Sequence, residues 1–355
     1  MSFIFILFML TFVFAFFLFL LFLFLLVRKG VMHYIARRNR NYERFIYPLI
    51  SRYITVDNHF QHRLLQQSKK WKRAILARML LDISTNIQSD EEWRRVEQAC
   101  ALIGLTNELR SQLQDKRWWK AAEAIRNIGI LKLKELLPLV EDQLLSPQYD
   151  VRMTTARTLS MHGRNRVLIE YLIQESHRLQ RVSIIRIADI LRKVTEEDVD
   201  LMLANMNRIS PLLQGLFIDL FGRARSMKAL PYLETCLSSS SVELRIKALK
   251  AMADIGIVSN QDEIMHGLRS DNWVERMQTI RVIQACSMYS AIPQLLDKLA
   301  DPEWWVRYRA AEALFGFGSV GKDNLRWASK HHHDSYAKDM ADQMLTKWHP
   351  EEAAL

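Results

Sequence analysis

Five tryptophans occupy positions from which aromatic side chains could grip another molecule. They are Trp118, Trp119, Trp273, Trp304 and Trp305, and each lies in the turn just ahead of an expected helix. Tryptophan and arginine are enriched at the energetically dominant positions of protein interfaces. One tryptophan of an adjacent pair can instead pack between neighbouring helices, so we expect one buried and one exposed member per pair. These five residues are candidates for binding a protein partner.

Four arginines recur at one position of a repeating pattern, where they could serve either a ligand or the fold. They are Arg152, Arg245, Arg276 and Arg307. Residues that recur with a repeat usually serve the repeat itself. The favoured interpretation is therefore structural, with each guanidinium holding a carboxylate in a neighbouring turn. The acidic candidates are Asp150, Asp271 and Asp301.

The sequence contains no arrangement typical of an enzyme active site. GxSxG, P-loop and HExxH motifs are absent. Three cysteines without a CxxC motif make neither a disulfide framework nor a tetra-cysteine zinc site. The run from His331 to His333, beside Asp334, cannot point all its rings at one ion from a helix, and we expect a solvated loop there. We predict a protein that is not an enzyme and has no cofactor and no metal.

Residues 1–27 are predicted to form a transmembrane anchor. They contain no ionisable side chain and hold ten of the chain's 16 phenylalanines. A helix of this length reaches about 40 Å, enough to cross a hydrocarbon core of about 30 Å. A cleaved signal peptide would have a basic start, a shorter apolar region and a small-x-small cleavage site, and the sequence shows none of these. We therefore expect a retained single-pass helix.

The net charge of +10 is concentrated next to this anchor. Residues 28–80 hold 13 Lys and Arg against two acidic residues, a net +11, so the remainder is close to neutral. The basic side chains nearest the anchor are Arg28, Lys29, Arg37, Arg38, Arg40 and Arg44. They place the body of the protein in the cytoplasm by the positive-inside rule. Residues 28–57 are either a simple positive flank or a segment that lies on anionic lipid. Specific nucleic-acid binding is not expected.

The rest of the chain repeats with a fixed period of 31, which is the interval from Arg245 to Arg276 and from Arg276 to Arg307. Counting from Arg152, the fourth and seventh positions after the start of each repeat are apolar in six consecutive repeats. That spacing lies on one face of a helix. Each repeat is therefore expected to open with an amphipathic helix.

Glycine and proline mark the ends of the expected helices. The eleventh position after the repeat start is Gly163, Gly256 or Gly318 in three repeats, where a helix would end in the left-handed conformation. A second helix in several repeats starts near a proline, which the first turn of a helix tolerates. The prolines are Pro138, Pro231 and Pro293. Each repeat is thus expected to hold two helices joined by a tight turn.

These patterns predict an all-α fold, an α-solenoid of helical hairpins, and five segments. After the anchor (1–27) and the basic segment (28–57) come degenerate helical units (58–114), regular repeats (115–320), and a capping helix with a tail (321–355). The first regular unit resembles the last one, DKRWWKAAEAIRNIG against DPEWWVRYRAAEALFGFG, but we read its spacing to the next repeat as 34 rather than 31. No long linker interrupts residues 60–350, so we expect one continuous superhelix.

The run VRYRAAEALFGFG (306–318) resembles the HEAT repeat, in particular the short bacterial form called PBS-lyase HEAT-like. The same frame is present at 150–163 and 242–256. The resemblance implies a curved scaffold that binds other proteins. Ser183 and Gln214 depart from the pattern, because they stand where the arginine is expected. The whole layout is similar to membrane-anchored HEAT proteins of bacteria.

Three functional hypotheses follow. The favoured one is a membrane-tethered cytoplasmic scaffold whose concave face, built by the second helices, binds a protein partner such as a membrane enzyme complex that makes surface polysaccharide. The alternative is a HEAT-like enzyme of the tetrapyrrole-lyase or DNA-glycosylase type, and the near-neutral body argues against the glycosylase. A third hypothesis is regulation through reversible contact of residues 28–80 with the membrane surface.

Overall fold

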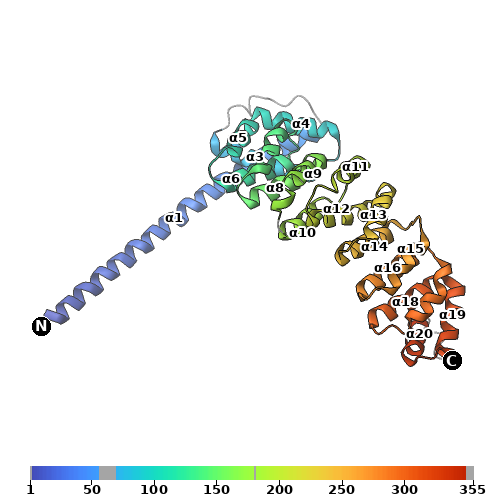
Figure 1. Cartoon of the computed structure of the whole chain (residues 1–355). Helices are drawn as coiled ribbons and strands as arrows, with labels where there is room; N and C mark the ends of the chain where they lie inside the picture. The colour runs from blue at the N-terminus through green and yellow to red at the C-terminus, as the bar shows by residue number, and fades with distance from the viewer. Residues whose placement is uncertain (1, 56–68, 180, 349–355) are drawn as a thin grey trace. The chain divides into compact units, whose positions relative to one another are not determined.

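The computed structural model describes residues 2–55, 69–179 and 181–348, and every regular element within these ranges is a helix. The early helices are α1 (Ser2–Thr55), α3 (Lys70–Ser84), α4 (Asp90–Leu102), α5 (Leu105–Leu113), α6 (Trp118–Ile130), α7 (Leu137–Glu141) and α8 (Tyr149–Met161). The middle ones are α9 (Asn165–Gln174), α10 (Arg181–Ile190), α11 (Glu196–Asn205), α12 (Pro211–Ala224), α13 (Leu230–Leu237) and α14 (Val242–Ile255). The last are α15 (Gln261–His266), α16 (Trp273–Ala285), α17 (Ile292–Lys298), α18 (Trp304–Gly316), α19 (Gly318–His331) and α20 (Ser335–Trp348). The all-α prediction is confirmed (Figure 1).

The chain divides into two compact units, residues 1–158 and 159–355, with the division inside α8. In the first unit, the end of α1 packs on α3 and α4, and α5 packs on α6. In the second unit, the first helices of successive hairpins pack side by side in the order α10, α12, α14, α16, α18 and α20. The shorter second helices α13, α15 and α17 each pack on the first helix that follows them.

The predicted apolar positions form the core of these hairpins. Of the twelve residues at the fourth and seventh positions after the repeat start, eleven are buried and Ile190 is half-buried. The prolines lie in the first turns of α7, α13 and α17. Each of these helices follows a short 3-10 turn, which completes the tight connection from the preceding first helix.

More turns adopt the left-handed conformation than the glycines in the sequence indicate. Gly163, Gly256 and Gly318 have φ between 69° and 80°, as predicted. Three non-glycine residues, Lys132, Arg225 and Ser287, have φ of 50–52° and stand in the same register of the repeat. The connection between first and second helix therefore has one geometry in six of the hairpins, whether or not glycine supplies it.

Two of the expected unit boundaries differ from the helices in the structure. The starts of α6 and α8 are separated by the common period, so the first regular unit does not have the longer spacing. The longer spacing results from counting to Arg152, but the residue of α6 that stands one period before Arg152 is Ala121. At the other end, α19 begins at Gly318 and completes a hairpin with α18, and α20 begins one period after α18. The capping helix is thus α20 alone.

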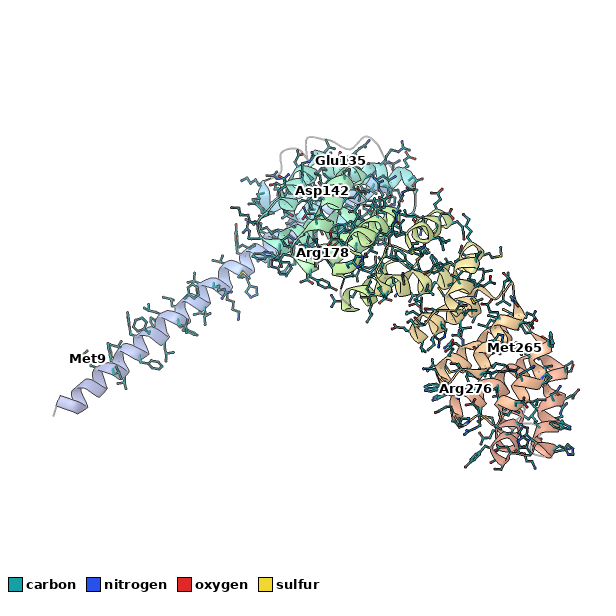
Figure 2. All side chains as sticks on the ribbon, viewed as in Figure 1. Met9, Glu135, Asp142, Arg178, Met265 and Arg276 are labelled. Atoms are coloured by element: carbon teal, nitrogen blue, oxygen red, sulfur yellow. The ribbon has the colours of Figure 1, made fainter. Side chains whose placement is uncertain are left out.

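Helix α1 does not stop at the predicted boundary of residue 27. It runs unbroken through Arg28 to Thr55, and Pro48 lies within it. Between Phe8 and Val27 its large apolar side chains are exposed, and Figure 2 shows Met9 near the N-terminal end of α1. Near its end, Ile46, Ile50, Tyr53 and Ile54 are buried. One continuous helix therefore joins the apolar segment to the core of the first unit.

Candidate functional site

The four recurring arginines share one contact that fixes the turn ahead of their own helix. In each case Nη1 donates to a main-chain carbonyl oxygen in that turn, at 2.7–2.9 Å. The donor and acceptor pairs are Arg152 with Ser146, Arg245 with Ser239, Arg276 with Ser270 and Arg307 with Asp301. A charged donor satisfies a carbonyl that the turn leaves free, so the arginine acts as a clamp between turn and helix.

Two of these arginines also bridge to the next hairpin through a carboxylate. Arg245 makes a bidentate pair with Glu275 at 2.7 and 2.8 Å. Arg276 does the same with Asp301 at 2.8 and 2.6 Å, and the Asp301 side chain is only 1% exposed. The expected partners differ in part, because Asp271 contributes its main-chain oxygen and both bonds described for Arg152 go to carbonyl oxygens rather than to Asp150.

These pairs hold their carboxylates ionised. Hydrogen bonds from Arg245 lower the pKa of Glu275 against the opposing effect of burial, and Ser270 adds a further bond. Burial alone would raise the pKa of Asp301, but hydrogen bonds from Arg276 and the backbone of Glu303 outweigh it, and the pKa of Asp301 is lowered. The bidentate geometry and the partial burial make these the strong ion pairs of the second unit.

The tryptophan pairs do not divide into one buried and one exposed residue, so that expectation is wrong. Trp118 and Trp119 are 41% and 53% exposed, and Trp304 and Trp305 are 44% and 52% exposed. Each pair forms the first two residues of its helix, and the buried residues of that helix begin only at Ala121 or Val306. Both rings of a pair therefore lie beyond the packed part of the stack. Trp273 opens α16 and is half-buried.

Around Trp304 the exposed rings form a small aromatic surface. The rings of Trp304 and Trp305 meet edge to face at 4.7 Å, and Trp304 stacks on Tyr308 at 5.2 Å. The guanidinium of Arg307 lies 5.2 Å from the ring of Tyr336 in α20. This combination of aromatic faces and a nearby arginine has the composition of a protein-binding surface.

The histidine run is only in part the solvated loop that we expected. His331 ends α19, and His333 is exposed, but His332 is 5% exposed and stacks on His333. The Nδ1 atom of His332 accepts a hydrogen bond from the backbone N–H of Asp334. His332 stands in the same register as Asp301, and both are buried. No group of three metal-ligating side chains is found in the part of the chain that the structure describes.

The basic residues after the apolar segment form two groups on α1. Lys29, His33, Arg37, Arg40 and Arg44 recur at spacings of three and four, so they lie on one face, and all are exposed. Arg28 is also exposed.

Arg38 projects from another side of α1, and its guanidinium lies 4.0 Å from the ring centre of Trp71 in α3. Tyr42 meets the same ring edge to face at 5.4 Å. Arg38 therefore helps to fix α1 on α3, while the exposed basic stripe on α1 is left for solvent or lipid.

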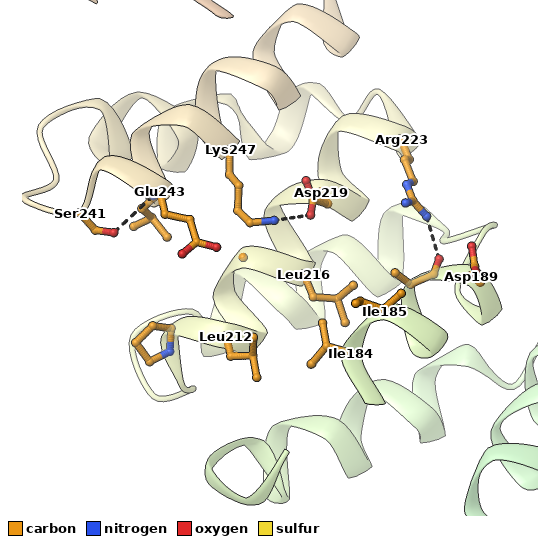
Figure 3. Close-up of a pocket in the computed structure, with 14 residues that line it drawn as sticks. Ile184, Ile185, Asp189, Leu212, Leu216, Asp219, Arg223, Ser241, Glu243 and Lys247 are labelled. Atoms are coloured by element: carbon orange, nitrogen blue, oxygen red, sulfur yellow. Dashed lines mark hydrogen bonds and ion pairs between the residues drawn. The ribbon is translucent and has the colours of Figure 1, made fainter. Parts of the chain in front are cut away.

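A hollow of about 540 Å³ lies between the first helices α10, α12 and α14 (Figure 3). Its apolar lining includes Ile184, Ile185, Leu212, Leu216 and Leu244. The charged residues that line it are Asp189, Asp219, Arg223, Glu243 and Lys247. We call this hollow the α12 groove. It is built by first helices, whereas the sequence analysis placed the binding surface on the second helices.

Sequence reasoning missed the α12 groove, although a signal was present. Gly215 directly follows the repeat's first position. The residues at the same place in the other hairpins are Ala122, Met153, Ile184, Ile246, Met277 and Tyr308. Comparing repeats position by position, rather than seeking apolar periodicity, would have found a missing side chain in the middle of the array.

A second hollow of about 510 Å³ lies among α13, α14, α15 and α16, and the Arg245–Glu275 pair lines it. Because Arg245 and Glu275 already pair with each other, we assign this hollow to the contact between the two hairpins.

The sequence matches no family model and none of the curated proteins. Solved structures do resemble the fold. A mutant of Kap121p superposes with a TM-score of 0.50 at 11% identity, over 89% of this chain and 42% of that one. The karyopherin Kap121p bound to the SUMO protease Ulp1p gives 0.52 at 10% identity, over 87% and 42%. This chain thus spans about two fifths of the length of those structures, and the likeness establishes a HEAT-like helical-repeat fold.

Proposed function

We propose that this protein is a membrane-tethered helical-repeat scaffold that holds a protein partner at the membrane. The observation that carries the proposal is α1. Its N-terminal part is the one described helix long and apolar enough to span a membrane, and none of its most apolar stretch is buried inside the structure. A core helix of a soluble protein would be covered, and so large an apolar surface is not left in water. A bilayer is the covering that fits its length.

The continuity of α1 supports retention of the apolar segment as an anchor. The helix passes residue 27 without a break and is fixed at its far end by Ile46, Ile50, Tyr53 and Ile54. The basic residues that follow the apolar segment favour a cytoplasmic body. The exposed stripe of Lys29, Arg37, Arg40 and Arg44 supports contact with anionic lipid headgroups near the bilayer. This layout is similar to that of the membrane-anchored bacterial HEAT proteins named above.

The partner that we propose is another membrane protein, for instance a membrane enzyme complex. Tethering confines both molecules to one plane and raises their effective concentration without adding a contact. The aromatic surface around Trp304 supplies exposed side chains of the kind that dominate protein interfaces. The Kap121p structures include one bound to a protein, which shows such binding for that chain and illustrates what a helical-repeat stack can do. No specific observation favours the enzyme alternative.

Cell fractionation of the full chain and of a variant lacking residues 2–27 tests the tether. We expect the full chain to stay with membranes in alkaline carbonate and to keep residues 1–27 by intact mass, whereas the truncated variant becomes extractable. A reporter fused after residue 355 should be active on the cytoplasmic side. A full chain that carbonate extracts, or that has lost the segment 1–27, would contradict the proposal.

Photocrosslinking in cells tests the partner. A photoreactive amino acid in place of Trp305 should capture a membrane protein in a defined adduct. The matched control is the same substitution at Arg326, which is exposed on α19. The same adducts from both positions would indicate random collision and remove the support for a scaffold.

A further inference from the structure

The outer part of the exposed stripe on α1 combines positive charge with an aromatic ring. Arg37, Arg40 and Arg44 follow one another at spacings of three and four residues, and all three are exposed. Tyr47 comes three residues after Arg44, so it lies on the same face of the helix, and it is 52% exposed. Arginine and tyrosine are enriched among the residues that dominate the binding energy of protein interfaces. We call these four residues the α1 surface.

The positive charge of the α1 surface is not balanced within α1. Glu43 is the one acidic residue between positions 28 and 55, and it pairs with Arg78 of α3. The side of α1 that packs on α3 and α4 carries Tyr42, Ile46 and Tyr53. By helical spacing this packed side lies opposite the α1 surface. The three arginines therefore face away from the helices that cover α1.

The α1 surface stands farther from the bilayer than lipid headgroups reach. Helix α1 runs unbroken from the apolar segment to Thr55, and Figure 1 shows its exposed part as one rod. At 1.5 Å per residue, Arg40 and Arg44 stand about 20 and 25 Å beyond Val27. The headgroup layer is only about 5–7 Å thick on each side of the bilayer. The field of charged lipids falls off over about 8 Å.

Tilting of the span does not remove this difference. A tilt of about 20°, the average for transmembrane helices, lowers these heights by less than about a tenth. Lys29 lies within reach of the headgroups, because it comes two residues after Val27. The near end of the stripe can therefore contact lipid, whereas Arg40 and Arg44 remain in the cytoplasm.

Neither membrane orientation nor packing explains why the α1 surface lies on one exposed face. The positive-inside rule depends on the number of Lys and Arg residues near the span, not on their position around a helix, and it does not involve tyrosine. Arg38 has the packing role, because its guanidinium lies against the ring of Trp71. The α1 surface is thus left for a contact outside this chain.

We propose that the α1 surface binds an acidic helical segment of the partner membrane protein, which runs alongside α1 in the cytoplasm. The inference rests on the proposed scaffold function and names the chemistry of its contact. The near end of the stripe contacts headgroups, and the outer part binds the partner about 15–30 Å from the hydrocarbon core.

An acidic helix matches the α1 surface in charge and in spacing. Carboxylates at the same spacings of three and four residues would meet Arg37, Arg40 and Arg44, since two helices packed lengthwise keep their register over such intervals. Arginine pairs with carboxylates through two parallel hydrogen bonds. An aliphatic side chain one turn farther along would cover the ring of Tyr47. Tethering both molecules in one bilayer holds the two helices side by side.

Fluorescence anisotropy on the full chain, in nanodiscs of zwitterionic lipid, tests the binding. The probe is a labelled helical peptide with glutamate at positions i, i+3 and i+7 and leucine at i+10, and its matched form carries lysine for each glutamate. The first variant is Arg40→Gln with Arg44→Gln, and the second is Tyr47→Ser. The control is Arg126→Gln with Arg157→Gln, which removes the same charge at exposed positions of α6 and α8.

We expect the wild-type chain and the control to bind the glutamate peptide equally and to bind the lysine peptide weakly. Arg40→Gln with Arg44→Gln should weaken binding of the glutamate peptide at least about tenfold, which is about 1.4 kcal/mol. Tyr47→Ser should weaken it without any change of charge. The charge reversal Arg40→Glu with Arg44→Glu should prefer the lysine peptide.

A fluorescent amino acid at position 29 or 44 distinguishes a protein contact from a lipid contact. In nanodiscs that contain anionic lipid and a lipid with a quencher on its headgroup, we expect strong quenching at position 29 and weak quenching at position 44. Equal quenching at the two positions would place the α1 surface on the bilayer and overturn the proposal.

The proposal is also overturned if Arg40→Gln with Arg44→Gln binds the glutamate peptide as tightly as the control does, or if the wild type binds neither peptide. A single-stranded oligonucleotide of the same charge that binds the wild type more tightly than the peptide would identify a different class of partner and overturn it as well. These results would leave the membrane tether untouched, because fractionation tests it separately.

Discussion

The hairpins that begin with α14 and α16 and those that begin with α10 and α12 follow the same plan but differ in what their side chains do. In the first group, Arg245 and Arg276 each clamp their own turn and pair with a carboxylate of the next hairpin. In the second, Gln214 makes one neutral bond to the carbonyl oxygen of Met206 at 2.8 Å. The regular hairpins are joined by bidentate arginine–carboxylate pairs, whereas the hairpins of α10 and α12 are joined by separate contacts such as the bond from Arg223 to the carbonyl oxygen of Ala188.

This difference indicates how functional positions can be found in a repeat protein. The repeats of one chain can be compared with each other, because each position recurs once per repeat under similar physical demands. A residue that recurs serves packing or turns. A residue that departs from the pattern serves a contact of its own, as Gly215 leaves room for the side chain of Lys247, which pairs with Asp219.

The largest effect should come from breaking the clamp in a regular hairpin. Arg276→Ala leaves the carboxylate of Asp301 buried without its partner, which typically destabilises a protein by about 3–5 kcal/mol. Gln214→Ala, at the same register position, removes a neutral hydrogen bond and should cost about 1 kcal/mol. Urea unfolding of the full chain in detergent, followed by circular dichroism, measures both.

The control for that comparison is Arg309→Ala, which removes a half-buried pair with Glu312 within one turn of α18 and should cost less than about 1 kcal/mol. Equal costs at Arg276 and Gln214 would mean that the two groups of hairpins do not differ energetically, and the contrast would lose its basis.

Acid should weaken the regular hairpins before the departing ones. The pKa values of Glu275 and Asp301 are lowered below their ordinary values of 4.5 and 3.8 in the folded chain. Groups whose pKa is lowered on folding stabilise the fold above the unfolded pKa, and that stability is lost as the pH falls through the folded pKa. The fluorescence of Trp273, Trp304 and Trp305 should therefore report earlier unfolding in urea as the pH drops below about 4.5.

Asp301→Asn removes one titrating group and should flatten this dependence. If the acid limb is equally steep in Asp301→Asn and in the wild type, the clamp does not control it.

The sequence predicted the parts of the fold that depend on local spacing. Apolar residues such as Leu249 and Ile280 recur on one helix face and are buried. Gly163 and Gly256 predicted the left-handed turns, because few other residues adopt that conformation cheaply. Pattern and structure agree at these positions because a single helix and its adjacent turn determine them.

The sequence predicted less well what depends on where a helix ends relative to its neighbours. Trp118 and Trp304 are exposed because the packed part of each helix begins a few residues later, which periodicity does not reveal. The α12 groove depends on how α10, α12 and α14 are placed relative to one another. Apolar periodicity describes one helix at a time, so a search for periods does not find a hollow between helices.

Substitutions in the left-handed turns should change the free energy of unfolding by smaller amounts. Ser287→Gly and Arg225→Gly should each stabilise the chain by up to about 1 kcal/mol, because a side chain is strained at φ near 50°. Gly256→Ala should destabilise it by about as much. Thermal unfolding of the full chain in detergent measures all three. A glycine that stabilises neither position would show that local bonds already compensate for the strain.

The smallest expected effect on stability is that of a substitution at Ile185. It tests most directly whether the exposed side chains of the α10 and α12 hairpins contribute to folding. Because the side chain is 64% exposed, Ile185→Ser removes little buried surface and should change the free energy of unfolding by less than about 0.5 kcal/mol. Ile218→Ala, at a fully buried position of α12, should cost about 2–5 kcal/mol. A loss above about 1 kcal/mol at Ile185 would place this side chain among those that hold the hairpins together. The apolar lining of the α12 groove would then be part of the fold.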